Sequence, residues 1–245
     1  QFSQQNNQSN GKTDAISGNF RFEWKIDSLT TIMYRPSVNF SKGNSNSGSF
    51  SETLNNELIP INQKEATNRQ TNDRFSTNGS LQFNRKLNSK GRNIALRLYY
   101  NLDNGNSDRY SLANTYYLKY GDSIKVQNQW IDNLNRNHEY RVQLTYMEPV
   151  FTNHFIEINY SYQHRSSLSE KYAYDWNDLE DSYSQYPDTA QSDCYKNKYS
   201  IHQVGAFFRT IRTNYFYNIG IEIEPQQTTN QSYMRDTTLE YSSRN

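Results

Sequence analysis

Hydrophobic and polar residues alternate strictly along the segment NFRFEWKID, residues 19–27. Phe20, Phe22, Trp24 and Ile26 take every second position, and amide or charged side chains take the positions between them. Successive side chains of a β-strand point to opposite faces of the sheet, so this period predicts a strand with one apolar and one polar face. Because the apolar face is built from large side chains, it must meet either a protein core or lipid.

The same alternation recurs along the chain and predicts an all-β protein. We expect eight antiparallel strands, at residues 18–26, 30–43, 74–87, 92–102, 137–148, 154–165, 199–210 and 215–225. The segment 199–210 is the weak one, because Phe207 interrupts the contrast between the two faces. No segment shows the spacing of an amphipathic helix.

The connections between these strands fall into two kinds. Short turns are expected at residues 27–28, 88–91, 150–153 and 211–214, and long polar stretches at 44–72, 103–136 and 166–198. Loops of such length are uncommon inside compact soluble domains. Tight turns at one end and long loops at the other are typical of outer-membrane barrels, with periplasmic turns and extracellular loops. The sequence therefore predicts an antiparallel up-and-down transmembrane β-barrel segment whose apolar face meets lipid.

The period assigns individual side chains to the two sides of this wall. The residues predicted to face lipid are Phe20, Phe22, Trp24, Ile26, Tyr34, Val38, Leu96, Leu98, Leu144, Ile156, Ile158, Ile219 and Ile221. The residues predicted to face the lumen are Arg21, Glu23, Lys25, Arg35, Arg97, Arg141, Glu157, Glu222 and Glu224. We expect the lumen charges to pair across strands and to pack against a plug. Tuning of pore selectivity is the alternative role for them.

Two other architectures share the alternating pattern. In a soluble antiparallel sandwich, strands average about 5–6 residues and turns recur every 8–12 residues or so. The alternating stretches here are longer, and the long polar stretches lie at one end only. Both features favour a barrel whose apolar face meets lipid over a soluble sandwich. The alternatives are a soluble or surface-exposed β-rich module that binds a ligand or glycan, and a closed eight-stranded porin-like or adhesive barrel.

Composition bears on whether the chain folds and on whether it binds nucleic acid. Only 33% of the residues are hydrophobic and the mean hydropathy is −1.05, values that alone would suggest disorder. Aromatic residues make up 15% of the chain, however, and disordered chains are poor in them. The formal net charge is +1, so no global field attracts nucleic acid, and we expect no nucleic-acid partner.

The reactive side chains do not form a recognisable catalytic or metal-binding motif. Cys194 is the only cysteine, which excludes an internal disulfide framework and a cysteine-based zinc site. The histidines have no ligand spacing; they are His138, His154, His164 and His202. The acidic segment 175–183 lacks the glycine of a calcium loop, and residues 103–108, DNGNSD, have the composition of a turn. We therefore expect no enzyme activity, cofactor or metal.

Aromatic residues are also frequent in the long polar stretches. They are Tyr110, Tyr116, Tyr117, Trp130, Tyr172, Tyr174 and Trp176. Such rings can stack on sugar or peptide ligands. Strands that continue beyond the membrane plane would explain them equally well.

The count of connections predicts that residues 1–245 form a single segment of a larger barrel. A barrel with both termini in the periplasm has one more long loop than short turns, whereas four short turns and three long stretches are expected here. The polar terminal segments, 1–17 and 226–245, are both expected on the long-loop side. The sequence starts at Gln1 without Met and without a basic and apolar leader, which agrees with truncation. We therefore expect a fragment with open edges that need neighbouring strands.

Three stretches carry a resemblance to a known family: SKGRNIALRLYYNLDN (89–104), YMEPVFTNHFIEINYSYQHRSSLSEKYAYD (146–175) and NYFYNIGIEIEP (214–225). They resemble the outer membrane protein β-barrel family, the barrel regions of TonB-dependent-receptor-like proteins. The KGRN turn, the Y-x-EP motif and the Y-N-x-GI strand are its most specific pieces, and it spans about Gly18 to Pro225.

The resemblance implies a location in the cell outer membrane of a Gram-negative bacterium and a part in nutrient uptake. The partners it implies are outer-membrane lipid, the remaining strands and plug of the full-length protein, an energising periplasmic partner and a surface lipoprotein. It also implies an N-terminal carboxypeptidase-regulatory-like module. Neither that module nor the plug lies within residues 1–245.

Overall fold

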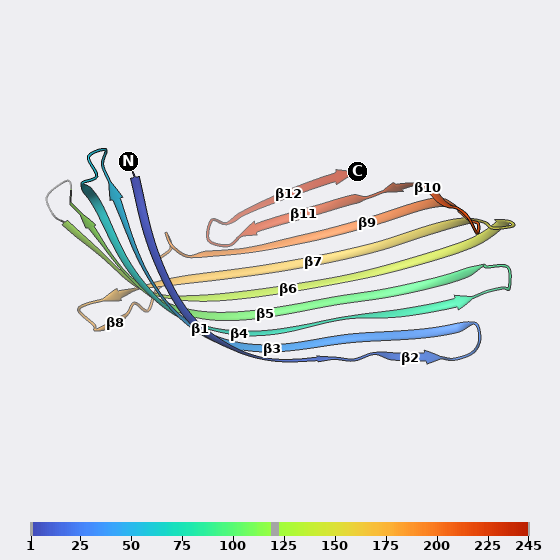
Figure 1. The fold of residues 1–245 in the computed structure, drawn as a ribbon, viewed down its shortest axis with the longest axis horizontal. Coiled ribbons are helices and arrows are strands. Elements are labelled where there is room, and N and C mark those ends of the chain that lie inside the picture. The colour runs from blue at the N-terminus through green and yellow to red at the C-terminus, as the bar shows by residue number, and fades with distance from the viewer. Residues whose placement is uncertain (1, 119–122, 245) are drawn as a thin grey trace.

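The computed structural model describes residues 2–118 and 123–244, in which long antiparallel strands form one sheet (Figure 1). The strands are β1 (Phe2–Asn19), β2 (Phe22–Lys25), β3 (Thr30–Leu54), β4 (Pro60–Lys86), β5 (Asn93–Tyr117), β6 (Ser123–Phe151), β7 (His154–Asn177), β8 (Ser182–Tyr183), β9 (Asp193–Ile211), β10 (Phe216–Ile223), β11 (Pro225–Ser232) and β12 (Thr237–Arg244). No helix that could cross a bilayer occurs in these residues.

The sheet follows the order β1-β3-β4-β5-β6-β7-β9-β11-β12, with β2 paired to β3, β10 to β9 and β8 to β7. The all-β, antiparallel, up-and-down fold predicted from the sequence is therefore confirmed. The expected number of strands is wrong: there are twelve strand segments in the described residues, not eight. The sheet is open in this structure, with β1 and β12 at its two ends, so the closed eight-stranded barrel does not form.

The central strands are much longer than the alternating segments that predicted them. β3 to β7 contain 25, 27, 25, 29 and 24 residues. At about 3.3 Å per residue they are roughly 80–100 Å long. The hydrocarbon core of a bilayer is only about 30 Å thick, so strands of this length project well beyond it.

Most of the polar sequence expected to form loops is strand. Asn44 pairs with Thr71 between β3 and β4, and Asp108 pairs with Asp132 between β5 and β6. The stretch DNGNSD lies inside β5, where Asp103 Oδ2 accepts a 2.5 Å hydrogen bond from Arg74 Nη2 on β4. Both faces of these distal segments carry polar side chains, so the two-residue period disappears although the backbone ladder continues. The polar termini are also strands, in β1 and in the β11–β12 hairpin.

The four tight turns lie where the sequence predicts them. They connect β2 to β3, β4 to β5, β6 to β7, and β9 to β10. We call this end of the sheet the turn end and the opposite end the distal end. In the β4–β5 turn, Asn88 Oδ1 accepts hydrogen bonds from the backbone N–H groups of Lys90 and Arg92, at 3.0 and 2.9 Å. Gly91 has φ = 105°, and a Cβ there would lie 2.8 Å from the Phe155 ring. The turn therefore needs glycine at this position.

The register carries one apolar face across the whole sheet at the turn end. One row of directly paired residues runs through β2, β3, β4, β5, β6, β7, β9 and β10: Trp24, Ile32, Phe83, Leu96, Leu144, Tyr160, Val204 and Ile223. Such a row forms only if the hydrophobic set of every strand lies on the same face.

The segment 199–210, whose alternation is weak, is a regular part of β9 in the structure. Val204 and Phe208 take the apolar face, and Phe207 lies on the polar face. The Phe207 ring covers two glycines, because a Cβ on Gly205 or Gly220 would lie 2.6 or 2.3 Å from its atoms. This apolar side chain therefore packs against the exposed backbone of the two glycines on the polar face.

Candidate functional site

The apolar face at the turn end, which we call the apolar belt, contains every residue predicted to face lipid. They are Phe20, Phe22, Trp24, Ile26, Tyr34, Val38, Leu96, Leu98, Leu144, Ile156, Ile158, Ile219 and Ile221. The belt is exposed: Ile221 keeps 76% of its surface accessible, and Leu98 keeps 37%. Soluble monomers rarely expose contiguous apolar patches larger than a few hundred Å². Contact of this face with lipid remains a prediction.

The opposite face of the same strands, which we call the polar face, contains all nine residues predicted to face the lumen. They are Arg21, Glu23, Lys25, Arg35, Arg97, Arg141, Glu157, Glu222 and Glu224, of which Arg21 and Glu224 are placed by their contacts with Glu23 and Gln203. Several interact with neighbours on this face. Arg21 Nη2 lies 2.9 Å from Glu23 Oε2, Arg141 donates to Gln163 Oε1, and Gln203 Nε2 donates to Glu222 Oε1 at 2.7 Å.

The most buried ion pair of the polar face joins β7 and β9. Arg209 Nη2 lies 2.6 Å from Glu157 Oε2, and Glu157 is only 7% exposed. Asn159 Nδ2 donates a further hydrogen bond of 2.9 Å to Glu157 Oε1. Both carboxylate oxygens thus have donors, which the charge of a buried carboxylate requires. The expected pairing of charges across strands is clearest here.

Tyrosine and histidine side chains gather at the distal margin of the apolar belt. Tyr140 pairs with His164 between β6 and β7 with stacked rings, and Tyr160 OH lies 3.1 Å from His202 Nδ1. His138 is close by, two residues before Tyr140 on β6. Aromatic girdles are common where a barrel meets the membrane–water interface. The register thus collects three of the four histidines beside tyrosines.

These histidines do not build a metal centre. Within residues 2–118 and 123–244, no group of three or more His, Cys, Asp or Glu side chains is arranged to hold a metal ion. His154, the fourth histidine, lies at the turn end, where its Nδ1 is 2.7 Å from Thr210 Oγ1. Cys194 is buried, and burial raises the pKa of its thiol, which keeps it protonated and poorly nucleophilic.

The aromatic residues predicted in the distal stretches contact each other. Trp130 stacks on Tyr174 with ring centroids 4.8 Å apart. Tyr183 lies 5.8 Å from Tyr110 and 5.1 Å from Trp176, measured between ring centroids. Its burial raises the pKa of its phenol. We call Tyr110, Trp130, Tyr174, Trp176 and Tyr183 the aromatic cluster.

Sequence reasoning missed Tyr183, the residue at the centre of this cluster. It belongs to an acidic segment without periodicity, and only the short pairing of β8 with β7 brings it onto Trp176. Tyr116 and Tyr117 lie at the distal end of β5, outside the cluster. Tyr172 lies outside it as well, beside Cys194, and burial raises the pKa of its phenol.

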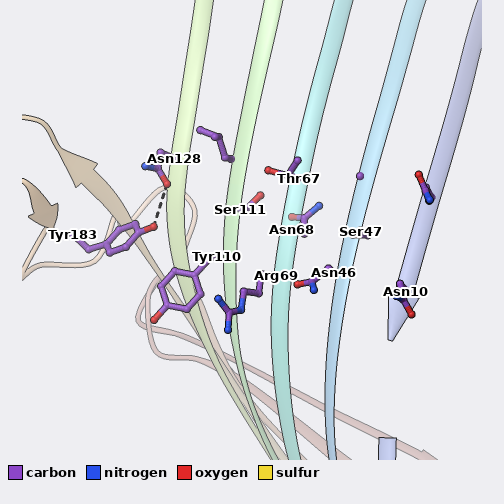
Figure 2. A pocket seen from close by; sticks show the side chains of 13 residues that line it. Asn10, Asn46, Ser47, Thr67, Asn68, Arg69, Tyr110, Ser111, Asn128 and Tyr183 are labelled. Carbon is purple, nitrogen blue, oxygen red and sulfur yellow. Dashed lines mark hydrogen bonds between the residues drawn. The ribbon is translucent and has the colours of Figure 1, made fainter. Parts of the chain in front are cut away.

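A hollow of about 530 Å³ lies beside the aromatic cluster at the distal end, where β1 and β3 to β6 curve away from the rest of the sheet (Figures 1 and 2). We call it the distal hollow. Two rows of paired residues cross its floor: Asn10, Asn46, Arg69 and Tyr110, then Gln8, Gly48, Thr67, Leu112 and Asn128. Asn46 lies eight positions after the belt residue Val38 along β3, an even offset, and the register has no bulge between them. The hollow therefore opens on the same sheet face as the apolar belt.

Comparisons with known proteins found a weak structural similarity and no match in sequence. No protein-family model matches the sequence, and no curated protein matches it. Among solved structures, the chain is similar to the ferric citrate transporter FecA in the unliganded form, with 9% sequence identity and a TM-score of 0.36. The similar region covers 96% of this chain and 40% of that chain. The likeness is weak, and the resemblance to the outer membrane protein β-barrel family remains a prediction.

Proposed function

We propose that this chain is the membrane-embedded part of an outer-membrane β-barrel that takes part in nutrient uptake. The observation that carries the proposal is the apolar belt, which crosses eight neighbouring strands and is backed by a polar, charged face. In a transmembrane barrel the outward face is apolar over a band about 25 Å tall and the inward face is polar. The belt and the polar face match these two requirements.

The topology of the sheet supports a barrel with further strands. The path from β1 to β12 contains nine strands, each antiparallel to the next, so β1 and β12 run in the same direction. Joining these two edges would require a parallel pair, whereas bacterial barrels close with an even number of antiparallel strands. Closure in lipid therefore needs an odd number of additional strands, because unpaired backbone groups in hydrocarbon cost several kcal/mol each.

The polar face supports a role in solute passage. It carries cations such as Arg97 and Arg141 on one group of strands, and the carboxylates of Glu222 and Glu224 on another. Within the described residues, Lys25 and Arg35 form no ion pair, which leaves them able to contact water or a plug. The plug, the energising periplasmic partner and the surface lipoprotein are further parts of the same proposal.

Orientation is tested by cysteine labelling in intact cells, in a Cys194→Ser background. Leu179, in the distal connection between β7 and β9, is 96% exposed, and Ser89 lies exposed in the β4–β5 turn. A membrane-impermeant maleimide should label Leu179→Cys in intact cells and should reach Ser89→Cys only after lysis. The reverse pattern would invert the topology, and no labelling of Leu179→Cys before lysis would contradict exposure at the cell surface.

The uptake role is tested by deleting the gene and measuring accumulation of radiolabelled sugars, peptides and chelated metals. Accumulation of one solute class should fall in the deletion strain and recover on complementation. Complementation with the Leu179→Cys variant serves as the control, because its labelling in intact cells shows that the complementing protein has reached the cell surface. Unchanged accumulation of every class would reject uptake while leaving the membrane location intact.

A further inference from the structure

We propose that the distal hollow is a binding site for a saccharide. Saccharides present hydroxyl groups that both donate and accept hydrogen bonds, and they present an apolar C–H face. A site that recognises them combines donors and acceptors with an aromatic ring. The distal hollow combines these features on neighbouring, paired strands.

Three polar side chains on the floor of the hollow, Asn10, Asn46 and Arg69, form no side-chain hydrogen bond with another described residue. The two amides can both donate and accept, and the guanidinium of Arg69 carries five donors. Because the paired positions in β1, β3 and β4 set their spacing, a bound sugar would find several donors and acceptors already arranged at one place.

Aromatic rings stand at one side of the same hollow. Tyr110 is 46% exposed, and Tyr183 approaches it at 5.8 Å between ring centroids. The hydroxyl of Tyr183 donates a 3.1 Å hydrogen bond to Asn128 Oδ1, which fixes the second ring (Figure 2). An exposed ring held beside a fixed one can stack on the C–H face of a sugar with little loss of side-chain entropy.

The size and charge of the hollow narrow the class of ligand. Its volume of about 530 Å³ lies within the usual range of small-molecule sites, roughly 300–1,000 Å³. Its lining contains one charged side chain, Arg69, and no carboxylate. A cation would find no anionic ligand there, and Leu112 is the only large aliphatic contact for an apolar peptide side chain. A neutral or anionic saccharide fits this lining best.

Gly48 marks the space that the ligand would take. A Cβ added at Gly48 would meet no atom within 4 Å, so the volume above it is open. Gly105 offers a matched position, because a Cβ there meets no atom closer than 4.0 Å. Gly105 lies five positions before the floor residue Tyr110 on β5. Because this offset is odd, Gly105 faces the opposite side of the sheet. Tryptophan at Gly48 should fill the hollow, whereas tryptophan at Gly105 should leave it empty.

Two sources can supply such a saccharide. The hollow shares a face with the apolar belt, so the sugar part of a glycolipid in the surrounding membrane can reach it. A free oligosaccharide at the cell surface is the other source. The first source requires the proposed membrane location, whereas the binding chemistry of the hollow does not depend on it.

The test is calorimetric titration of the detergent-purified full-length protein with two sets of probes. One set contains free neutral and acidic oligosaccharides, and the other contains lipopolysaccharide and its delipidated oligosaccharide. Binding is expected in at least one set. Gly48→Trp and Arg69→Ala should each weaken binding about tenfold or more. The tryptophan would occupy the volume of the ligand, and the alanine would remove a hydrogen bond from a charged donor. Gly105→Trp and Arg136→Ala, whose arginine lies outside the hollow, should bind like the wild type.

Each outcome of this titration decides the proposal. Binding confined to lipopolysaccharide and its oligosaccharide identifies a membrane glycolipid as the source, and binding of the free oligosaccharides identifies a cell-surface ligand. No binding in either set overturns the saccharide site, even if cysteine labelling places the chain in the outer membrane. Binding that survives both Gly48→Trp and Arg69→Ala also overturns it, because the ligand would then occupy another place.

Discussion

Leu98→Arg is expected to lower the free energy of unfolding of the full-length protein in lipid vesicles by about 2–4 kcal/mol, the cost of an arginine on the lipid face of a barrel near the bilayer midplane. Leu98 lies on the apolar belt and pairs directly with Leu81 on β4 and Val142 on β6. An arginine there would have neither a counterion nor water within the hydrocarbon. Urea titrations of the protein in vesicles, followed by tryptophan fluorescence, measure the loss.

The matched control lies on the same strand. Asn101 is on the polar face of β5 and pairs directly with Glu139 on β6. Asn101→Arg adds the same side chain opposite a carboxylate, so its effect on the free energy of folding should be small. An equal loss in Leu98→Arg and Asn101→Arg would show that the two faces meet the same solvent. Stable folding of the unmodified chain without detergent or lipid would contradict the membrane assignment directly.

The sequence predicts the turn-end half of the sheet well, because the environments of its two faces differ. Alternation marks a strand only where one face is apolar and the other is polar. Trp24, Leu96 and Ile221 supply that contrast, and their strands and shared face follow from it. In the distal half, Asn46 pairs with Arg69 on one face and Ser47 pairs with Asn68 on the other, so both faces are polar and the hydrophobic pattern does not reveal the strand pairing.

The candidate site depends on register, which the sequence does not reveal in polar segments. Sequence reasoning identifies Tyr110 and Trp130 as available aromatic rings, but it does not place Tyr183 beside them. Nor does it place Asn10 next to Asn46, because a shift of one residue would turn either side chain to the other face. Only the observed pairing brings the donors and the rings together.

Arg209→Met is expected to destabilise the folded protein by about 3–5 kcal/mol, the usual effect of removing one partner of a buried ion pair. Arg209 Nη2 is 2.6 Å from Glu157 Oε2, and the carboxylate is almost fully buried. Methionine preserves much of the packing of the arginine stem but supplies no donor. Glu157 would then keep only the hydrogen bond from Asn159, which is too little to offset the cost of a buried charge.

A double variant separates the loss of charge pairing from a loss of packing. Glu157→Gln combined with Arg209→Met removes both charges, and glutamine retains an oxygen that can accept from Asn159 Nδ2. The double variant should therefore be more stable than Arg209→Met alone, with the difference measured by urea titration in vesicles as a double-mutant cycle. If Glu157→Gln gives no recovery in the Arg209→Met background, the destabilisation arises from packing, and the ion pair does not hold β7 and β9 together.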